Sequence, residues 1–151
     1  MRMMAFTLLL GWAAVGCGND ESAGSPDLAR CIEGWWQDPA PSACACPGAV
    51  ECDASDCESR RVVAFMPDGV SFNGVVRVSP SAHTATPSGV IARATYSVEA
   101  GEVRMTSSGT QAYTAAVSCQ AAELVFNHVI KMRAPDWLAA DLTETVQQGG
   151  K

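Results

Sequence analysis

The feature that most constrains the fold of this chain is a series of short segments in which apolar and polar residues alternate. The clearest runs over residues 90–99, where every second residue from Val90 to Val98 is apolar. Such a period of two is typical of a strand with one buried face. Comparable segments predict further strands at residues 32–37, 60–66, 70–78, 102–105, 111–118 and 123–133.

Turn signals separate several of these segments. Pro67-Asp68-Gly69 ends one predicted strand, and Ala100-Gly101 joins two others into a hairpin. Asn73-Gly74 interrupts residues 70–78 and indicates either a second tight turn or a bulge. The segment 123–133 is predicted as one strand. Its apolar face would carry Leu124, Phe126, His128, Ile130 and Met132.

Signals for helices are nearly absent before Pro135. There Asp136 is predicted to cap a short helix, with Leu138, Leu142 and Val146 at four-residue spacing, and the tail from Gln147 is expected to fray. The fold class is therefore predicted as all-β, a small antiparallel up-and-down barrel of seven or eight short strands, with a β-sandwich as the alternative. The barrel domain would span residues 30–134, and the helix with its tail residues 135–151.

The N-terminus carries the pattern of an export signal. Arg2 precedes an apolar run over residues 5–15. A helix needs roughly 20 apolar residues to span a bilayer, so this shorter run favours a signal peptide over residues 1–16. The polar residues that follow, within 17–29, predict a flexible tether.

Cys17 stands directly after that signal. Ala14-Val15-Gly16-Cys17 resembles the bacterial lipobox, whose cysteine is acylated and becomes the new N-terminus. The alternative is ordinary cleavage after a small-x-small site, at the same bond. The chain has seven cysteines, and an exported protein with an odd number has one thiol to explain. A lipid on Cys17 leaves six cysteines, enough for three disulfides.

Four of those six lie in an insert over residues 38–59, rich in Pro, Ser and Asp. In an oxidising compartment disulfides are the default, and they are predicted for Cys31, Cys44, Cys46, Cys52, Cys57 and Cys119. The alternative is a metal cluster of the insert's cysteines and carboxylates, but the spacing fits neither a zinc site nor an EF-hand, so no metal is expected. The pairing stays open among 15 connectivities. At least one bridge is expected to tie the N-terminal part or the insert to a late strand.

The charge balance excludes some partners. The chain has 10 basic and 16 acidic residues and a formal net charge of −6. An acidic module without basic clusters is unsuited to nucleic acid or to anionic lipid headgroups. The N-terminal lipid, and not the protein surface, is therefore expected to hold the protein at a membrane.

Several short motifs resemble those of lipocalins and of small bacterial lipocalin-like lipoproteins. They are Gly34-Trp35-Trp36, Phe65-x-Pro67-Asp68-Gly69, residues 94–98 (Ala-Thr-Tyr-Ser-Val) and Leu124-Val125-Phe126. The resemblance covers roughly residues 31–133. It implies an up-and-down barrel, with Trp36 in its core, and an apolar ligand pocket. The candidate pocket residues are Trp36, Tyr96, Phe126 and His128.

No motif of a hydrolase, metalloprotease, P-loop or dinucleotide site is present, so neither an enzyme nor a cofactor is expected. The leading hypothesis is a lipid-anchored binding module of the bacterial cell envelope, for an apolar small molecule or an envelope protein. The alternative is a structural or interaction lipoprotein without a ligand, which recognises a partner through the disulfide-rich loop. By analogy with well-studied bacteria, Gly18 after the cysteine favours the outer membrane; the face is left open.

Overall fold

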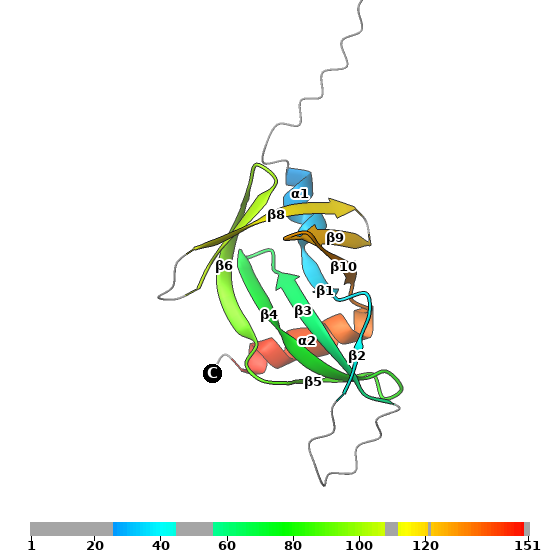
Figure 1. The fold of residues 1–151 in the computed structure, drawn as a ribbon. Coiled ribbons are helices and arrows are strands. Elements are labelled where there is room, and N and C mark those ends of the chain that lie inside the picture. Colours follow the sequence, from blue (N-terminus) through cyan, green and yellow to red (C-terminus); the bar gives the residue numbers. More distant parts are fainter. Residues whose placement is uncertain (1–25, 45–55, 108–111, 121, 150–151) are drawn as a thin grey trace, which may run out of the picture.

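A computed structural model describes residues 26–44, 56–107, 112–120 and 122–149. Over these residues eight strands form a closed antiparallel barrel (Figure 1). In ring order they are β1 (Gly34–Gln37), β3 (Glu58–Phe65), β4 (Val70–Ser79), β6 (Ala92–Glu99), β7 (Glu102–Thr106), β8 (Tyr113–Gln120), β9 (Glu123–Phe126) and β10 (Val129–Arg133). Each of these strands pairs with the next in this order, and β10 pairs with β1 to close the ring. The predicted up-and-down barrel is confirmed, and the β-sandwich alternative is wrong.

Two short strands extend the barrel at one end. β2 (Ser42–Ala43) pairs with the start of β3, and β5 (Thr84–Pro87) pairs with the end of β4. Residues 42–43 and 58–59, which the sequence placed in a structureless insert, are therefore strand residues. β2 and β5 thus flank the part of the β3–β4 ribbon that extends beyond the ring.

The inner core fills one end of the barrel. Buried residues from five of the ring strands meet in one cluster, and Ile32 of helix α1 (Pro26–Ile32) belongs to it. The strand members are Trp36, Val63, Phe65, Val103, Val117 and Leu124. Residues from opposite sides of a closed ring meet only inside it, so α1 and these side chains close the barrel at this end.

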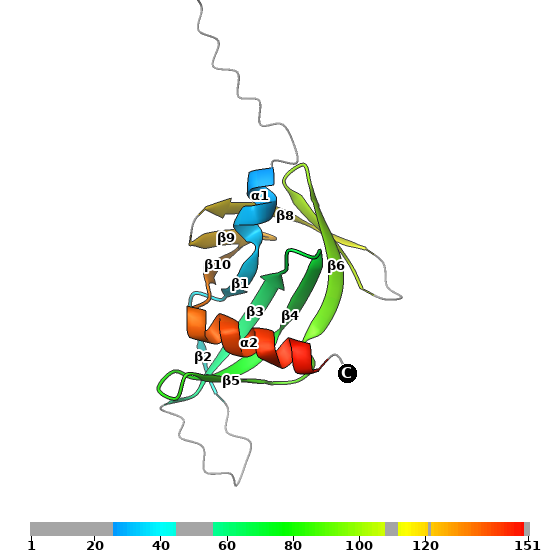
Figure 2. The same cartoon turned by 180° about the vertical axis from the view of Figure 1, so that it is seen from behind.

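A second core lies outside the ring, under helix α2 (Asp136–Gln148). Its Leu138 and Leu142 are fully buried against the outer face of β1, β3 and β4, which contributes Trp35 and Val62 among others. Figure 2 shows α2 lying across β3 and β4. The predicted C-terminal helix is confirmed. It begins at Asp136, with Pro135 at the cap position, and extends through Gln148, so Asp136 is not its cap and the first tail residues are helical.

Helix α1 corrects the predicted tether over 17–29 and the predicted start of the first strand at Ile32. Residues 26–32 are helical, and β1 begins at Gly34. Pro26-Asp27 is typical of a first helical turn, but seven residues are too few to show a helical period. Leu28 and Ile32, one turn apart, bring the helix to the inner core.

The segment 123–133, predicted as one strand, is a hairpin. Phe126 pairs with Val129, and Asn127 and His128 between them have φ angles of 49° and 64°. Positive φ at both residues is the requirement of a tight two-residue turn, which Asn and His tolerate better than most side chains. After this turn the residues that face the inside of the barrel are the odd-numbered ones of β10, and not the even-numbered ones as predicted. Lys131 therefore shares the inner face with Leu124, and His128, Ile130 and Met132 are exposed.

Asn73-Gly74 is neither a turn nor a bulge. Both residues lie inside β4, where the ladder with β3 runs without interruption from Ser71 to Val78. A side chain at position 74 would put its Cβ atom 3.2 Å from Cγ1 and 3.3 Å from Cα of Ile91. Gly74 therefore serves the close approach of the segment that leads into β6.

Disulfides fasten the fold in two places. Cys31 in α1 is bonded to Cys119 in β8, 88 residues away, and Cys44 is bonded to Cys57 across the base of the insert. This confirms the disulfide prediction for these four cysteines and the expected bridge to a late strand. Cys46 and Cys52 lie outside the described residues, as do Cys17, the predicted signal peptide over 1–16 and most of the predicted tether.

Candidate functional site

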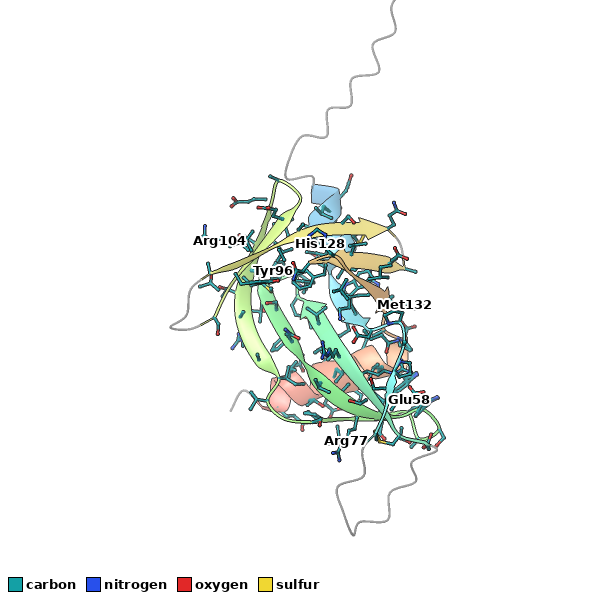
Figure 3. The ribbon with its side chains drawn as sticks, in the orientation of Figure 1. Glu58, Arg77, Tyr96, Arg104, His128 and Met132 are labelled. Carbon is teal, nitrogen blue, oxygen red and sulfur yellow. A yellow bond between two sulfur atoms is a disulfide. The ribbon has the colours of Figure 1, made fainter. Side chains whose placement is uncertain are left out.

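Three of the four predicted pocket residues lie in the packed inner core. Trp36 is fully buried, and the ring of Phe65 makes edge contacts with Tyr96 and Phe126 at centroid distances of 5.1 Å and 5.8 Å. His128 is an exposed residue of the β9–β10 turn (Figure 3) and is not a member of this core. The two cavities described below are not lined by any of these four side chains.

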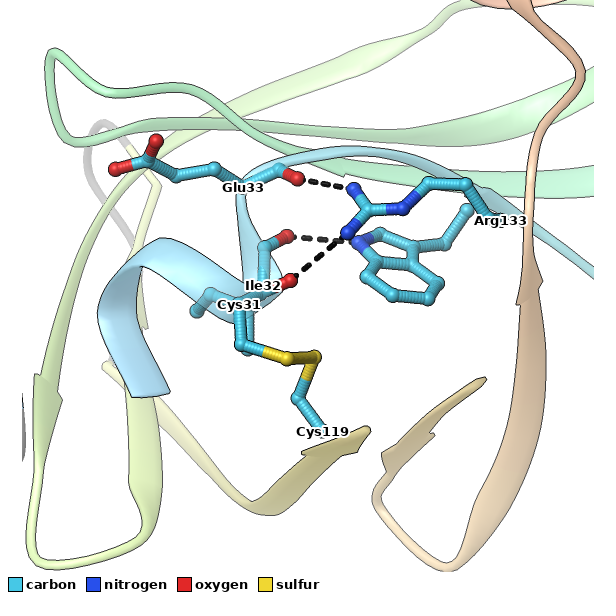
Figure 4. Close-up of a disulfide and its surroundings, with 6 residues drawn as sticks. Cys31, Ile32, Glu33, Cys119 and Arg133 are labelled. Atoms are coloured by element: carbon cyan, nitrogen blue, oxygen red, sulfur yellow. Dashed lines mark hydrogen bonds between the residues drawn. A yellow bond between two sulfur atoms is a disulfide. The ribbon is translucent and has the colours of Figure 1, made fainter. Parts of the chain in front are cut away.

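Arg133 closes this end of the barrel together with Trp36. Its guanidinium lies 3.9 Å from the centre of the Trp36 ring and donates hydrogen bonds to the carbonyl oxygens of Cys31 (3.0 Å) and Glu33 (Figure 4). The Trp36 indole donates to the carbonyl of Ile32 at 2.7 Å. Partial burial lowers the pKa of Arg133. These bonds hold α1 and the start of β1 against β10, beside the Cys31–Cys119 disulfide.

Gly34 has the geometry that this closure requires. Its φ angle is 109°, in a region that side-chain-bearing residues rarely adopt. A Cβ atom here would also lie 2.6 Å from Nη1 of Arg133. The glycine of the Gly-Trp-Trp segment is thus explained by the turn from α1 into β1.

Tyr96 fastens the β3–β4 turn to the barrel. Its hydroxyl donates a 2.9 Å hydrogen bond to the carbonyl of Met66. Burial raises the pKa of Tyr96, and the nearby charges of Glu33 and Asp68 raise it further. The phenol therefore stays protonated as a donor at neutral pH, which indicates a structural bond and not a catalytic base.

The inner face at the opposite end of the barrel carries charge. Lys131 forms an ion pair with Asp38, and the register places Arg61 and Arg77 on the same face of β3 and β4. Arg61 and Arg77 are exposed, as are the apolar Tyr113 and Val129 further round the ring. Solvent therefore reaches the inner face here, and neither described cavity lies there.

The larger cavity is a groove on the outside of the barrel, with a volume of about 760 Å³. It lies between the second half of α2 and the outer face of β4 and β6; Figure 2 shows the end of this helix beside the start of β6. The sheet side is mainly apolar and comprises Met66, Val70, Phe72, Pro87, Val90 and Ile91. The helix side comprises Thr143, Thr145, Val146, Gln147 and Gly149.

The apolar wall of the groove packs against the outer core on one side and is exposed to solvent on the other. The Phe72 ring stacks on Trp35, with ring centres 6.1 Å apart, so it is supported by the outer core. Val90, in contrast, is 90% exposed although it lines the groove. The charged side chains of the lining are Arg93, directly opposite Phe72 in the β4–β6 ladder, and Asp68 in the β3–β4 turn.

A smaller cavity of about 560 Å³ lies along α2 near Gly34 and Trp35. It is bounded by Arg133, Asp136 and Glu144 as well as by apolar side chains. The Trp35 indole, which lines this cavity, donates to the Thr143 hydroxyl at 3.0 Å, and Met66, Thr143 and Gln147 line both cavities. Its charged rim makes it a weaker candidate for an apolar molecule.

The carboxylates at the base of the insert have structural partners. Asp56 accepts hydrogen bonds from the hydroxyls of Ser79 and Ser81 and from the Ser81 amide, and these bonds lower the pKa of Asp56. Glu58 pairs with Arg60. In the described ranges no group of three or more potential ligand side chains is placed to hold a metal ion.

No protein-family model matches the chain, and no curated protein or solved structure is significantly similar to it. Within the described residues, neither helix is long and apolar enough to cross a membrane. The fold is that of an eight-stranded antiparallel closed barrel with a C-terminal helix packed on its outside.

Proposed function

We propose that this protein is a binding module for an apolar small molecule, and that the groove between α2 and the β4–β6 face is its binding site. The observation that carries the proposal is an apolar groove of about 760 Å³ with a highly exposed valine on its wall. Ligand sites typically have volumes of roughly 300–1,000 Å³, apolar walls and a few polar groups that fix orientation. This groove fits that description, whereas the inner core is filled by its own side chains.

The exposure of Val90 in particular supports the binding of an apolar ligand in the groove. Fully burying a valine side chain stabilises by about 1.5–3 kcal/mol, and Val90 gains almost none of this in the free protein. An apolar molecule seated against Phe72 and Ile91 would cover Val90 as well. Binding would then remove protein and ligand surface from water together.

Val90→Asp is expected to weaken the binding of the neutral dye Nile red by about tenfold, because it places a charge on the apolar wall. The fold should be unaffected, since Val90 is exposed. Dye fluorescence against protein concentration measures the effect. Val129→Asp is the matched control, because Val129 is 49% exposed and lies away from the groove. Wild-type protein that leaves the dye dark, or an equal loss in both variants, would contradict the proposal.

We further propose that the module is anchored in the bacterial cell envelope, on the outer membrane, by a lipid on Cys17. The lipobox-like segment and the odd number of cysteines support this. We also propose that the protein is related to lipocalin-like lipoproteins. The short motifs and the eight-stranded barrel support this. Acyl chains on Cys17 would hold the protein at the membrane without any need for a membrane-binding surface on the folded domain.

Cys17→Ser is expected to move the protein from the membrane fraction to the soluble fraction, because no acyl chain can be attached. Fractionation of cells that produce the full chain, followed by intact-mass measurement, reports both the location and the modification. Cys46→Ser serves as the control for loss of a cysteine. A Cys17→Ser protein that stays in the membrane fraction would show that the anchor lies elsewhere.

A second candidate function is partner recognition through the insert. Cys44–Cys57 closes the base of the insert, and Asp56, held by Ser79 and Ser81, fixes it to the β4–β5 connection. A loop with a fixed base loses less conformational entropy on binding than a free one. Residues 45–55 lie outside the described residues, so the proposal rests on this base alone.

A further inference from the structure

We propose that Arg93 makes the groove selective for single-chain amphiphiles with one carboxylate, with the head group at Arg93 and the hydrocarbon chain on the apolar wall. This inference rests on the proposed function, because it names the ligand class of the same groove. It is carried by the position of one cation within an otherwise apolar wall.

The β4–β6 register fixes where that cation lies. Arg93 is directly opposite Phe72, and side chains in such pairs have Cβ atoms about 4.5–5.5 Å apart on the same face of the sheet. The methylene stem of Arg93 thus lies beside Phe72 in the lining of the groove, and Arg93 is exposed to solvent. Arg93 is the only cationic side chain among the described residues that line the groove.

Arg93 is also free to bind a ligand. It is exposed, and it forms no hydrogen bond or ion pair within the described part of the chain. Arg60 and Arg133, in contrast, are engaged by Glu58 and by backbone carbonyls. The chain has more acidic than basic residues, yet none of the described carboxylates pairs with Arg93. An arginine in this position at an apolar groove is suited to an anion from outside.

Asp68, the other charged side chain that lines the groove, restricts the class of ligand further. Asp68 lies in the turn before Val70, whose amide donates to its carboxylate at 3.2 Å. A second anionic group extended toward this turn would meet a like charge. The groove therefore suits one anionic group per ligand, and a carboxylate matches the planar donors of a guanidinium.

A structural role for Arg93 makes a different prediction. The last turn of α2 lines the groove and contains no basic residue, so a nearby cation would complement the partial negative charge of the helix end. If that were the sole role of Arg93, its loss would lower the melting temperature and leave ligand preference unchanged. Ligand preference and thermal stability must therefore be measured together.

The test compares dodecanoic acid with dodecanol and dodecylamine, below their aggregation concentrations, by calorimetric titration of the purified protein. The acid is expected to bind about fivefold more tightly than the alcohol, the gain of one exposed ion pair, and this preference should shrink at high salt. Arg93→Gln should abolish the preference without lowering the melting temperature. Arg104→Gln is the matched control, because Arg104 is an exposed strand arginine of β7 that does not line the groove (Figure 3).

Equal binding of acid and alcohol to the wild type would overturn the inference but leave the groove as an apolar site. A preference that persists in Arg93→Gln would overturn it too, as would tighter binding of the amine. If none of the three compounds binds, the proposed function fails along with the inference. Preference lost in Arg93→Gln and kept in Arg104→Gln would establish it.

Discussion

Replacing both Cys31 and Cys119 with serine is expected to lower the free energy of unfolding by about 4–5 kcal/mol. In the chain-entropy model the stabilisation grows with the length of the closed loop, and this disulfide joins residues 88 positions apart. Single domains are stable by roughly 5–15 kcal/mol, so the loss is a large fraction of the total. The cross-link also holds α1, which caps the barrel, against β8.

Urea unfolding of the wild type and the double variant, followed by tryptophan fluorescence, measures this loss. Cys44→Ser combined with Cys57→Ser is the matched control, because that bridge joins residues only 13 positions apart and is expected to contribute about 3 kcal/mol. Equal losses in the two double variants would contradict the dependence on loop length. A loss below about 1 kcal/mol for Cys31 and Cys119 would show that α1 is held by packing alone.

Trp36→Ala is expected to cost about 3–5 kcal/mol, as is usual for a large aromatic side chain removed from a core. Trp36 has no exposed surface, and its indole donates to the carbonyl of Ile32. It also lies under the guanidinium of Arg133. Its loss would leave a cavity at the closed end of the barrel and remove the surface on which Arg133 rests.

The control for this variant is Trp36→Phe, which keeps an aromatic ring and removes the indole N–H. We expect a loss of about 1–2 kcal/mol from the missing hydrogen bond and the smaller ring. Chemical denaturation of both variants separates packing from hydrogen bonding. A Trp36→Ala protein as stable as Trp36→Phe would mean that the closed end repacks around the gap.

Much of the barrel was predictable because its signals are local. Alternation over residues 90–99 and the turn at Pro67-Asp68-Gly69 depend only on neighbouring residues. The structure confirms the turn and a strand at Ala92–Glu99, whereas Val90 and Ile91 lie before that strand. The β9–β10 turn was missed because Asn127-His128 contains no glycine, and the apolar residues around it continue the alternation. Positive φ angles at those two residues depend on the register of the hairpin, which the pattern does not reveal.

The groove was not predictable from the sequence, because its walls come from separate elements. Phe72, Arg93 and Val146 belong to β4, β6 and α2, and only the strand register and the docking of α2 bring them together. The predicted pocket placed the ligand inside the barrel, where Trp36, Tyr96 and Phe126 pack against one another. A local hint was present in Val90-Ile91, two consecutive apolar residues in a segment that otherwise alternates.

The pairing of β1 with β10 has a consequence for the order in which this chain can mature. The first strand of the ring finds its second neighbour only after nearly the whole polypeptide has been made, so every shorter intermediate has two open sheet edges. Open edges pair readily with other chains. A protein built this way benefits from being kept unfolded until its C-terminal part is complete, which is how a chain exported in the unfolded state would reach its compartment.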